Sequence, residues 1–189
     1  MGPVTVCLGL GSNLGQREKN LAEAIRSLGA SRPPTLAGQA NGGPRDELSL
    51  DEIEIMRVSS VYETSPWGYK HQPDFLNCVL EAHTTLPPDK LLERVKEIEQ
   101  SVGRQPSVRY GPRHIDVDIL LYSDDIVDLP DLQIPHPRLH QRAFALVPLA
   151  ELHPDLVHPI LKTSIGILAS LVDGREGVSL WGPLFISAS

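Results

Sequence analysis

The order of strand-like and helix-like segments is the feature of this sequence that most restricts its fold. Apolar and β-branched runs predict four strands, at residues 4–10, 55–62, 75–85 and 115–122. Apolar residues at helical spacing predict two helices, at residues 16–28 and 87–102. The predicted order is therefore strand, helix, strand, strand, helix, strand.

This order matches the split βαβ arrangement of ferredoxin-like α+β domains, in which helices cover one face of an antiparallel sheet. Residues 143–152 and 164–172 predict a helical extension after the last strand. A chain of 189 residues fits one domain, which we assign to residues 1–174. Residues 31–51, rich in Pro and Gly, predict a long loop within it, and residues 175–189 form a tail of unknown role.

Composition and charge exclude several classes of protein. The formal net charge is -7, from 24 acidic residues against 17 Lys and Arg, which argues against general binding to nucleic acid or to an anionic membrane. The sequence has no apolar run of about 18 residues and no recognisable secretory signal, so we expect a cytoplasmic protein. Cys7 and Cys78 each lie in an apolar run, which favours buried thiols over a disulfide framework.

Two aspartates mark a candidate metal site. Asp116 and Asp118 lie two residues apart on a predicted strand, so both carboxylates should project from one face. Two adjacent like charges are costly to bury unless a cation joins them, and Mg²⁺ favours one or two carboxylates together with phosphate oxygens and water. A solvated strand face gives the same two letters, so the pair alone is a weak signal.

Cations on both sides of the aspartates strengthen the magnesium interpretation. They are Arg104, Arg109, Arg113, His136, Arg138, His140 and Arg142. Arginine stays charged and can hold phosphate oxygens at two points, so a metal with several arginines suits a triphosphate. Ordinary surface ion pairs remain the alternative for any single arginine. The glycines of residues 9–15 miss the dinucleotide-binding spacing by one residue, and the absence of Gly-Lys-Ser/Thr removes the P-loop.

Aromatic and amide residues in the loop after the second predicted strand and at the start of the third suit a flat heterocycle. The residues are Thr64, Trp67, Phe75 and Asn77. Aromatic rings can stack on the face of a heterocycle, and the Asn77 amide can form hydrogen bonds with its edge. An ordinary core position for Phe75 and a turn amide for Asn77 are the alternative interpretations.

Five motifs then occur in a recognisable order: GSNLG at 11–15, VYETSP at 61–66, QPDFLN at 72–77, GPRHIDVDILL at 111–121 and IPHP at 134–137. With them the chain resembles the 6-hydroxymethyl-7,8-dihydropterin pyrophosphokinases of folate biosynthesis, over about residues 4–159. The resemblance implies a ferredoxin-like fold. It also implies transfer of pyrophosphate from ATP to the pterin alcohol, which yields AMP and the pterin pyrophosphate.

The resemblance also implies roles for individual residues. Asp116 and Asp118 would hold two Mg²⁺ ions, and Arg104 and Arg113 would contact the phosphates during catalysis. The implied ATP-binding residues are Lys96, Glu99, Arg104, Arg109, Tyr110, Arg113, Ile119, His136 and Arg142. The implied pterin-binding residues are Asn13, Thr64, Trp67, Phe75, Asn77 and Phe144, with Phe75 and Phe144 sandwiching the ring.

The chain departs from this family at Tyr110, where Trp is common, at Pro137, where some members have Tyr, and at the insertion of residues 31–51. The insertion is either inert, which we favour, or a contact with a neighbouring enzyme of the folate pathway. One alternative function is a non-catalytic ferredoxin-like module that binds RNA or a small ligand, although no RNP-type motif is visible. Another is a magnesium-dependent nucleotidyltransferase, which would release pyrophosphate rather than AMP.

Overall fold

A computed structural model describes residues 2–29, 53–66, 71–103 and 111–184. Its centre is a six-stranded antiparallel sheet in the order β5-β1-β4-β3-β8, with β2 also paired to β4. The strands are β1 (Val4–Ser12), β2 (Ile53–Val58), β3 (Val61–Thr64), β4 (Phe75–Thr84), β5 (Asp116–Tyr122) and β8 (Val178–Gly182). The prediction of an α+β chain with an antiparallel sheet is confirmed.

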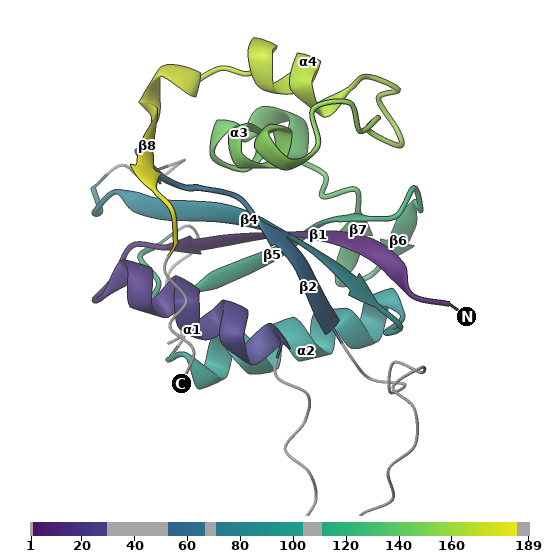
Figure 1. Ribbon diagram of the computed structural model, residues 1–189, viewed down its shortest axis with the longest axis horizontal. Helices are drawn as coiled ribbons and strands as arrows, with labels where there is room; N and C mark the ends of the chain where they lie inside the picture. Colours follow the sequence, from purple (N-terminus) through teal and green to yellow (C-terminus); the bar gives the residue numbers. More distant parts are fainter. Residues whose placement is uncertain (1, 30–52, 67–70, 104–110, 185–189) are drawn as a thin grey trace, which may run out of the picture.

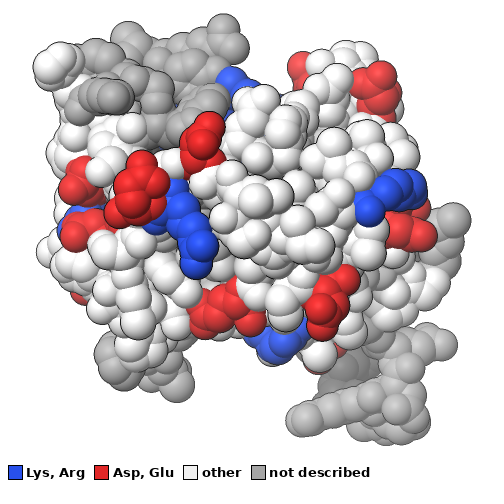
Figure 2. All heavy atoms as spheres, turned by 90° about the horizontal axis from the view of Figure 1, so that it is seen from above, with Lys and Arg blue, Asp and Glu red and all other residues white. Residues whose placement is uncertain are grey.

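Helices cover both faces of the sheet (Figure 1). The helices α1 (Arg17–Gly29) and α2 (Pro88–Ser101) lie against one face, and α3 (Ala143–Leu152) and α4 (Ile165–Leu171) lie against the other. No helix within the described ranges is long and apolar enough to cross a membrane. In the view onto α3 and α4, Lys and Arg side chains appear as separate patches, each beside acidic side chains, around a broad uncharged area (Figure 2).

Two hydrophobic cores form because successive side chains of a strand point to opposite faces. On β1, Leu8 and Leu10 pack with Leu21 and Ile25 of α1. Cys7, which precedes Leu8 and therefore points to the opposite face, instead joins the core under α3. Both cysteines are free and buried, as the sequence predicts.

The single strand predicted at residues 55–62 is wrong, because the chain breaks at Ser59 and Ser60 into β2 and β3. Ser59 donates its N–H to the Val79 carbonyl at 2.8 Å, and its Oγ accepts the Val79 N–H at 2.9 Å. The Glu151 carboxylate of α3 accepts from Ser60 N at 3.0 Å, from Ser60 Oγ at 3.0 Å and from Tyr62 OH at 2.9 Å. Side-chain bonds thus replace the regular ladder at the break.

Three short strands were not predicted. A hairpin of β6 (Val127–Leu129) and β7 (Leu132–Ile134) follows β5. Beyond Gly174, where no motif predicts any structure, β8 returns to pair with β3. The predicted long loop at residues 31–51 lies outside the described residues and stays a prediction.

Candidate active site

A cavity of about 510 Å³ brings together segments that are far apart in the sequence. Its lining comes from β1, β4 and β5, from α2 on one side of the sheet and from α3 on the other. The predicted site residues that line it are Thr64, Phe75, Asn77, Lys96, Glu99, Arg113, Asp116, Asp118, His136, Arg142 and Phe144. The structure therefore places the candidate metal, nucleotide and pterin residues around one cavity.

Two glycines of β1 lie at the floor of this cavity. Gly11 pairs with Asn77 of β4 on one side and with Asp116 of β5 on the other, and Gly9 pairs with Asp118. Directly paired residues project their side chains from the same face of a sheet, so these polar groups flank a strip of bare main chain. A Cβ atom on Gly11 would lie 2.6 Å from Asn77 Oδ1. The central strand thus leaves room for a ligand where any other residue would fill it.

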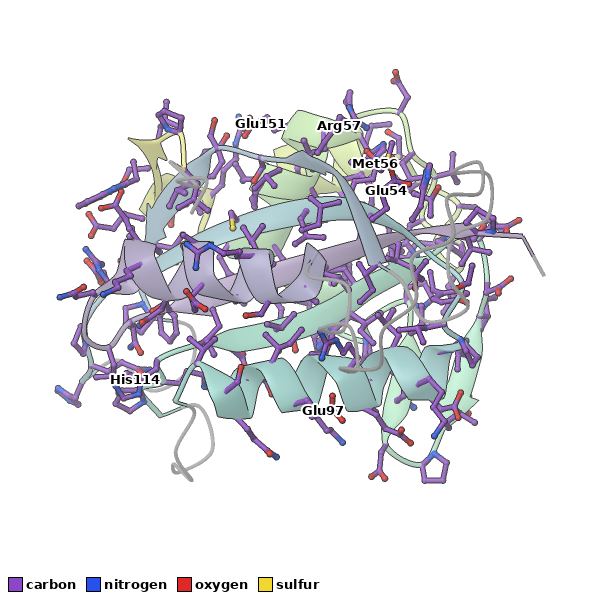
Figure 3. All side chains as sticks on the ribbon, turned by 60° about the horizontal axis from the view of Figure 1, so that its bottom comes forward. Glu54, Met56, Arg57, Glu97, His114 and Glu151 are labelled. Carbon is purple, nitrogen blue, oxygen red and sulfur yellow. The ribbon has the colours of Figure 1, made fainter. Side chains whose placement is uncertain are left out.

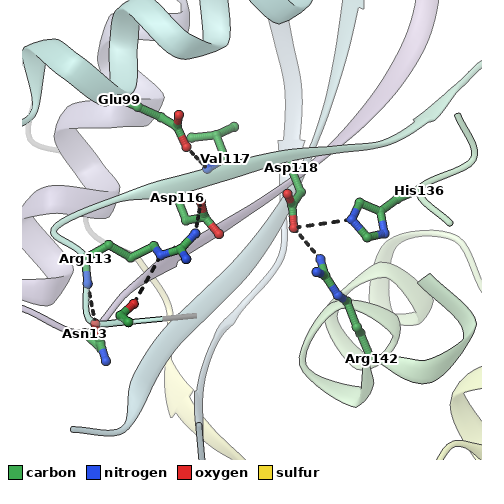
Figure 4. Close-up of polar contacts among 9 residues, drawn as sticks. Asn13, Glu99, Arg113, Asp116, Val117, Asp118, His136 and Arg142 are labelled. Atoms are coloured by element: carbon green, nitrogen blue, oxygen red, sulfur yellow. Dashed lines mark hydrogen bonds and ion pairs between the residues drawn. The ribbon is translucent and has the colours of Figure 1, made fainter. Parts of the chain in front are cut away.

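The two aspartates are each paired with an arginine (Figure 4). Asp116 Oδ1 accepts from Arg113 Nη1 at 2.6 Å, and Asp118 Oδ2 accepts from Arg142 Nη1 at 2.5 Å. The side chains of Asp116 and Asp118 remain 28% and 32% exposed, so both carboxylates are accessible from the cavity. The arginines offset the repulsion between two neighbouring carboxylates.

The donor set around the aspartates fits magnesium. No group of three or more His, Cys, Asp or Glu that could hold a metal is found in the part of the chain that the structure describes. Two carboxylates on one strand face are the oxygen donors available, and Mg²⁺ completes its shell from substrate phosphates and water when a protein offers one or two carboxylates.

Glu99 supports the strand that carries the aspartates. It is only 4% exposed, and its Oε1 accepts the Val117 N–H at 2.9 Å. Among the strands that the structure describes, β5 is an edge strand paired with β1, so this N–H has no strand partner there on its outer side. Glu99 therefore holds the main chain of Val117 in position between the two aspartates.

His136 lies beside Asp118, with Nε2 at 4.0 Å from Oδ2 (Figure 4). Burial, together with the nearby charges of Arg142 and Arg138, lowers the pKa of His136 to about 4. The ring is therefore neutral near pH 7 and faces the site as a hydrogen-bonding group rather than a cation.

The candidate pterin residues occupy another part of the same lining. Asn77 Nδ2 donates to Thr64 Oγ1 at 2.7 Å in a buried setting, which fixes the orientation of the amide. Phe75 comes from β4 and Phe144 from α3, and both rings line the cavity. The Arg142 guanidinium lies 5.4 Å from the centre of the Phe144 ring, which connects the pterin part of the lining to Asp118.

Asn13 is buried outside the cavity lining. Its Oδ1 accepts the Arg113 N–H at 2.8 Å, and its own N–H donates to the Arg113 carbonyl at 3.1 Å. Its Nδ2 donates to Gln72 Oε1 and to the Pro73 carbonyl, both at 3.0 Å. Asn13 thus joins the segment before β5 to the segment before β4.

The remaining predicted site residues lie elsewhere or cannot be placed. Ile119 is buried in the core shared with α1 and α2, and it is not among the residues that line the cavity. Trp67, Arg104, Arg109 and Tyr110 lie outside the described residues.

The lining also includes residues that were not predicted as site residues, among them Gly9, Gly11, Gln72 and Arg138. Two glycines separated by one residue within an apolar strand were the available signal, because glycine weakens a strand and marks a close approach to its backbone. Gln72 begins the QPDFLN motif, and Arg138 belongs to the group of cations around the aspartates.

Comparison with known proteins finds one matching family model and several similar proteins. The family model described as 7,8-dihydro-6-hydroxymethylpterin-pyrophosphokinase (HPPK) matches residues 7–154. The 2-amino-4-hydroxy-6-hydroxymethyldihydropteridine pyrophosphokinase of Aquifex aeolicus is 40% identical over 158 residues, which cover 84% of this chain and 86% of that protein. The protein of the same name from Bacillus subtilis is 39% identical over 174 residues, which cover 92% of this chain and 88% of that protein.

Solved structures support the fold. A crystal structure of HPPK-DHPS from Plasmodium falciparum matches with a TM-score of 0.66 at 14% sequence identity, and the match covers 94% of this chain but 46% of that one. This likeness concerns the fold alone. The extent of the family match and the identity to the two bacterial pyrophosphokinases lead to one conclusion, that the chain belongs to the 7,8-dihydro-6-hydroxymethylpterin-pyrophosphokinase family.

Proposed function

We propose that the chain transfers pyrophosphate from ATP to the hydroxymethyl group of 6-hydroxymethyl-7,8-dihydropterin, giving AMP and the pterin pyrophosphate for folate synthesis. One observation carries the proposal: Asp116 and Asp118, with their arginines, line the same cavity as Phe75, Asn77 and Phe144. A metal–phosphate site and an aromatic site therefore meet within one space. A non-catalytic binding module does not need the paired carboxylates.

Asp116 and Asp118 would hold Mg²⁺, with two ions proposed. Bound Mg²⁺ neutralises phosphate charge and makes the transferred phosphorus a better electrophile. The two carboxylates lie at the cavity surface. Their residues on β5 pair directly with Gly9 and Gly11 on β1. They are thereby directed toward the space that the phosphates would occupy.

Arg113 and Arg142 would stabilise charge that builds up on the phosphates, because guanidinium groups are permanent cations that bind phosphate oxygens. No covalent intermediate with the protein is needed, since phosphoryl transfer relies on positioning and electrostatics. Arg142 and Glu99 are buried, so they hold their positions with little freedom. Arg104, Arg109 and Tyr110 keep their predicted roles, as do Lys96 and Ile119.

Phe75 and Phe144 would stack on the pterin ring, and Asn77 would read its edge. Because Asn77 Nδ2 is already bonded to Thr64, its Oδ1 is the atom that faces Gly11 and the cavity. It thus offers an acceptor to N–H groups of the pterin. Asn13 would act here indirectly, through Gln72 and Pro73.

Several finer features also belong to the proposal. The strand order supports a ferredoxin-like unit formed by β1 to β5 with α1 and α2. A cytoplasmic location and contacts with neighbouring enzymes of the folate pathway remain predictions.

The decisive experiment incubates the protein with ATP, Mg²⁺ and 6-hydroxymethyl-7,8-dihydropterin and separates the nucleotide products. We expect AMP that forms only when the pterin is present. Free pyrophosphate in place of AMP would indicate a nucleotidyltransferase, and unchanged ATP in the presence of the pterin would contradict the proposed activity.

A further inference from the structure

The strand β8 lies beside the part of the sheet that carries the candidate pterin residues. It pairs with β3 so that Thr64 lies opposite Val178, Glu63 opposite Ser179 and Tyr62 opposite Leu180. One residue further, the Ser65 N–H donates to the Gly177 carbonyl at 3.4 Å. No motif and no proposed role has been assigned to these C-terminal residues.

Through this pairing β8 supports Thr64. The strand β3 has only four residues, and it is held between β4 on one side and β8 on the other. Without β8 it would be a short edge strand with unpaired N–H and C=O groups, and such strands open easily. Thr64 is 3% exposed in this arrangement, and its Oγ1 receives the Asn77 amide. The position of the Asn77 side chain thus depends on a strand that β8 completes.

A second connection runs from β8 through Arg17 at the start of α1. The Arg17 guanidinium lies 5.3 Å from the centre of the Trp181 ring. The same guanidinium donates to the Asp74 carbonyl at 2.8 Å and pairs with Glu63 Oε1 at 2.8 Å. Asp74 immediately precedes Phe75, so the stacked Trp181 ring restricts the group that holds the start of β4.

Trp181 is anchored independently of Arg17. Its indole Nε1 donates to Glu18 Oε1 at 3.0 Å. The ring is still 45% exposed, so its contribution lies in these directed contacts more than in filling a core. Its neighbour Leu180 is 66% exposed and is absent from the hydrophobic clusters of the described chain.

We propose that residues 178–182, which we call the C-terminal clasp, position Thr64, Asn77 and Phe75 for pterin binding, with Trp181 as the positioning residue. The proposal rests on the proposed function for the identity of the ligand. In the sheet β8 is separated from β5, which carries the aspartate pair, by β3, β4 and β1, so the clasp sets the affinity for the pterin and not the affinity for the nucleotide. Trp181 acts through Arg17 and β3 and is not a catalytic residue.

The test compares three variants of the full chain. Trp181→Ala removes both contacts of the ring and should raise the KM for the pterin by roughly fivefold, while the KM for ATP and kcat at saturating pterin stay unchanged. Trp181→Phe keeps a ring against Arg17 but loses the bond to Glu18, and it should recover part of the loss. Leu180→Ala, the matched control on the same strand, should behave as the wild type.

A second measurement does not depend on activity. Hydrogen exchange at the amides of residues 61–64 and 75–77 should be faster in Trp181→Ala than in Leu180→Ala, with exchange in β5 unchanged. An unchanged pterin KM together with unchanged exchange would overturn the clasp proposal. Equal losses for pterin and ATP, with a general fall in thermal stability, would also overturn it. Absence of activity in the wild type would instead contradict the proposed function, and the exchange data would still decide the role of the clasp.

Discussion

At the scale of single residues, the pairing of each aspartate with an arginine explains how two carboxylates can stand side by side on β5. Asp116 is held by Arg113 and Asp118 by Arg142, and each arginine lies within hydrogen-bonding distance of its partner. The same four groups provide the opposite charges that a metal-bound triphosphate needs. The ion pairs therefore balance the carboxylate charges in the free protein, and the same groups would bind the metal and the phosphates in the proposed complex.

The role of Asp118 can be tested by removing its charge while keeping its shape. Asp118→Asn retains an oxygen that accepts from Arg142 but loses the anionic ligand, so we expect kcat to fall by roughly a hundredfold or more with the fold intact. Pterin-dependent AMP formation gives the rate, and circular dichroism gives the melting temperature. Asp131→Asn, in the exposed turn between β6 and β7, is the control. A wild-type rate in Asp118→Asn would remove Asp118 from the site.

The bare main chain at Gly11 gives a second test. In Gly11→Ala the new Cβ would lie 2.6 Å from Asn77 Oδ1, so the amide must move and pterin affinity should fall by roughly tenfold or more. Gly29→Ala, at the end of α1 and outside the cavity lining, is the matched control, because its Cβ meets the Ile55 side chain at 3.2 Å, and that side chain can shift. Calorimetry with the pterin measures both variants. Equal affinities in the two variants would mean that Asn77 does not bind the pterin.

At the scale of elements, α3 holds the broken edge of the sheet together. Figure 3 shows Glu151 and Arg57 on the same side of the molecule, where β2 and α3 meet. Arg57 pairs with Glu81 at 2.5 Å and donates to the Leu152 carbonyl at 3.2 Å, while Glu151 binds Ser60 and Tyr62. The end of α3 is therefore tied to both halves of the interrupted strand.

The contact between α3 and β3 should be visible in the titration of Tyr62. Burial and the Glu151 carboxylate raise the pKa of Tyr62 to about 12 from its ordinary 10.0. In Glu151→Gln the charge is removed but the burial remains, so the pKa should move down and stay above 10.0. Ultraviolet titration of the tyrosines reports it, with Glu97→Gln as the control, because Glu97 is an exposed carboxylate on α2, against the other face of the sheet. An unchanged Tyr62 pKa would contradict the contact.

The elements that sequence alone predicted are those whose apolar spacing is long and regular, such as α1, α2, β4 and β5. The break between β2 and β3 was not predictable, because it depends on Ser59 bonding to Val79 and on Glu151, which lies 91 residues from Ser60. The strand β8 is short and mostly exposed, and its stability comes from pairing with β3 and not from its own pattern. Both are cases in which tertiary contacts outweigh local propensity.

The same distinction applies to the candidate site. Strand periodicity predicted that Asp116 and Asp118 project from the same face, and the register of β5 against β1 agrees with this. The assignment of Ile119 to the nucleotide site came from resemblance and stays a prediction. Strand alternation places its side chain in the core with α1 and α2. Arg138 and Gln72 were noted in the sequence only as one of the cations around the aspartates and as the first residue of a motif, and it is the folded chain that brings their segments to the cavity.

At the scale of the whole molecule, two buried thiols make the stability of the fold decrease at alkaline pH. Burial raises the pKa of Cys7 and of Cys78 to about 12, from 9.0. As pH rises above 9.0 the unfolded chain loses these protons while the folded chain keeps them, so the free energy of unfolding falls between pH 9.0 and about 12.

Denaturant unfolding at a series of alkaline pH values measures this effect, and Tyr62 adds to it in the same direction. Thiol reagents should modify Cys7 and Cys78 in the unfolded chain and leave them unmodified in the folded chain. A free energy of unfolding that stays constant above pH 9.0, or rapid modification of the native protein, would contradict the burial of the two thiols.

The backbone floor of the cavity also has a consequence for inhibitor resistance. Side-chain walls can change shape by mutation one rotamer at a time, but the strip at Gly9 and Gly11 has no side chain to exchange for a smaller one. A substitution there that excludes a flat inhibitor also excludes a flat substrate of the same thickness. Compounds that rest on this strip are therefore harder to escape by point mutation than compounds that rely on the surrounding side chains.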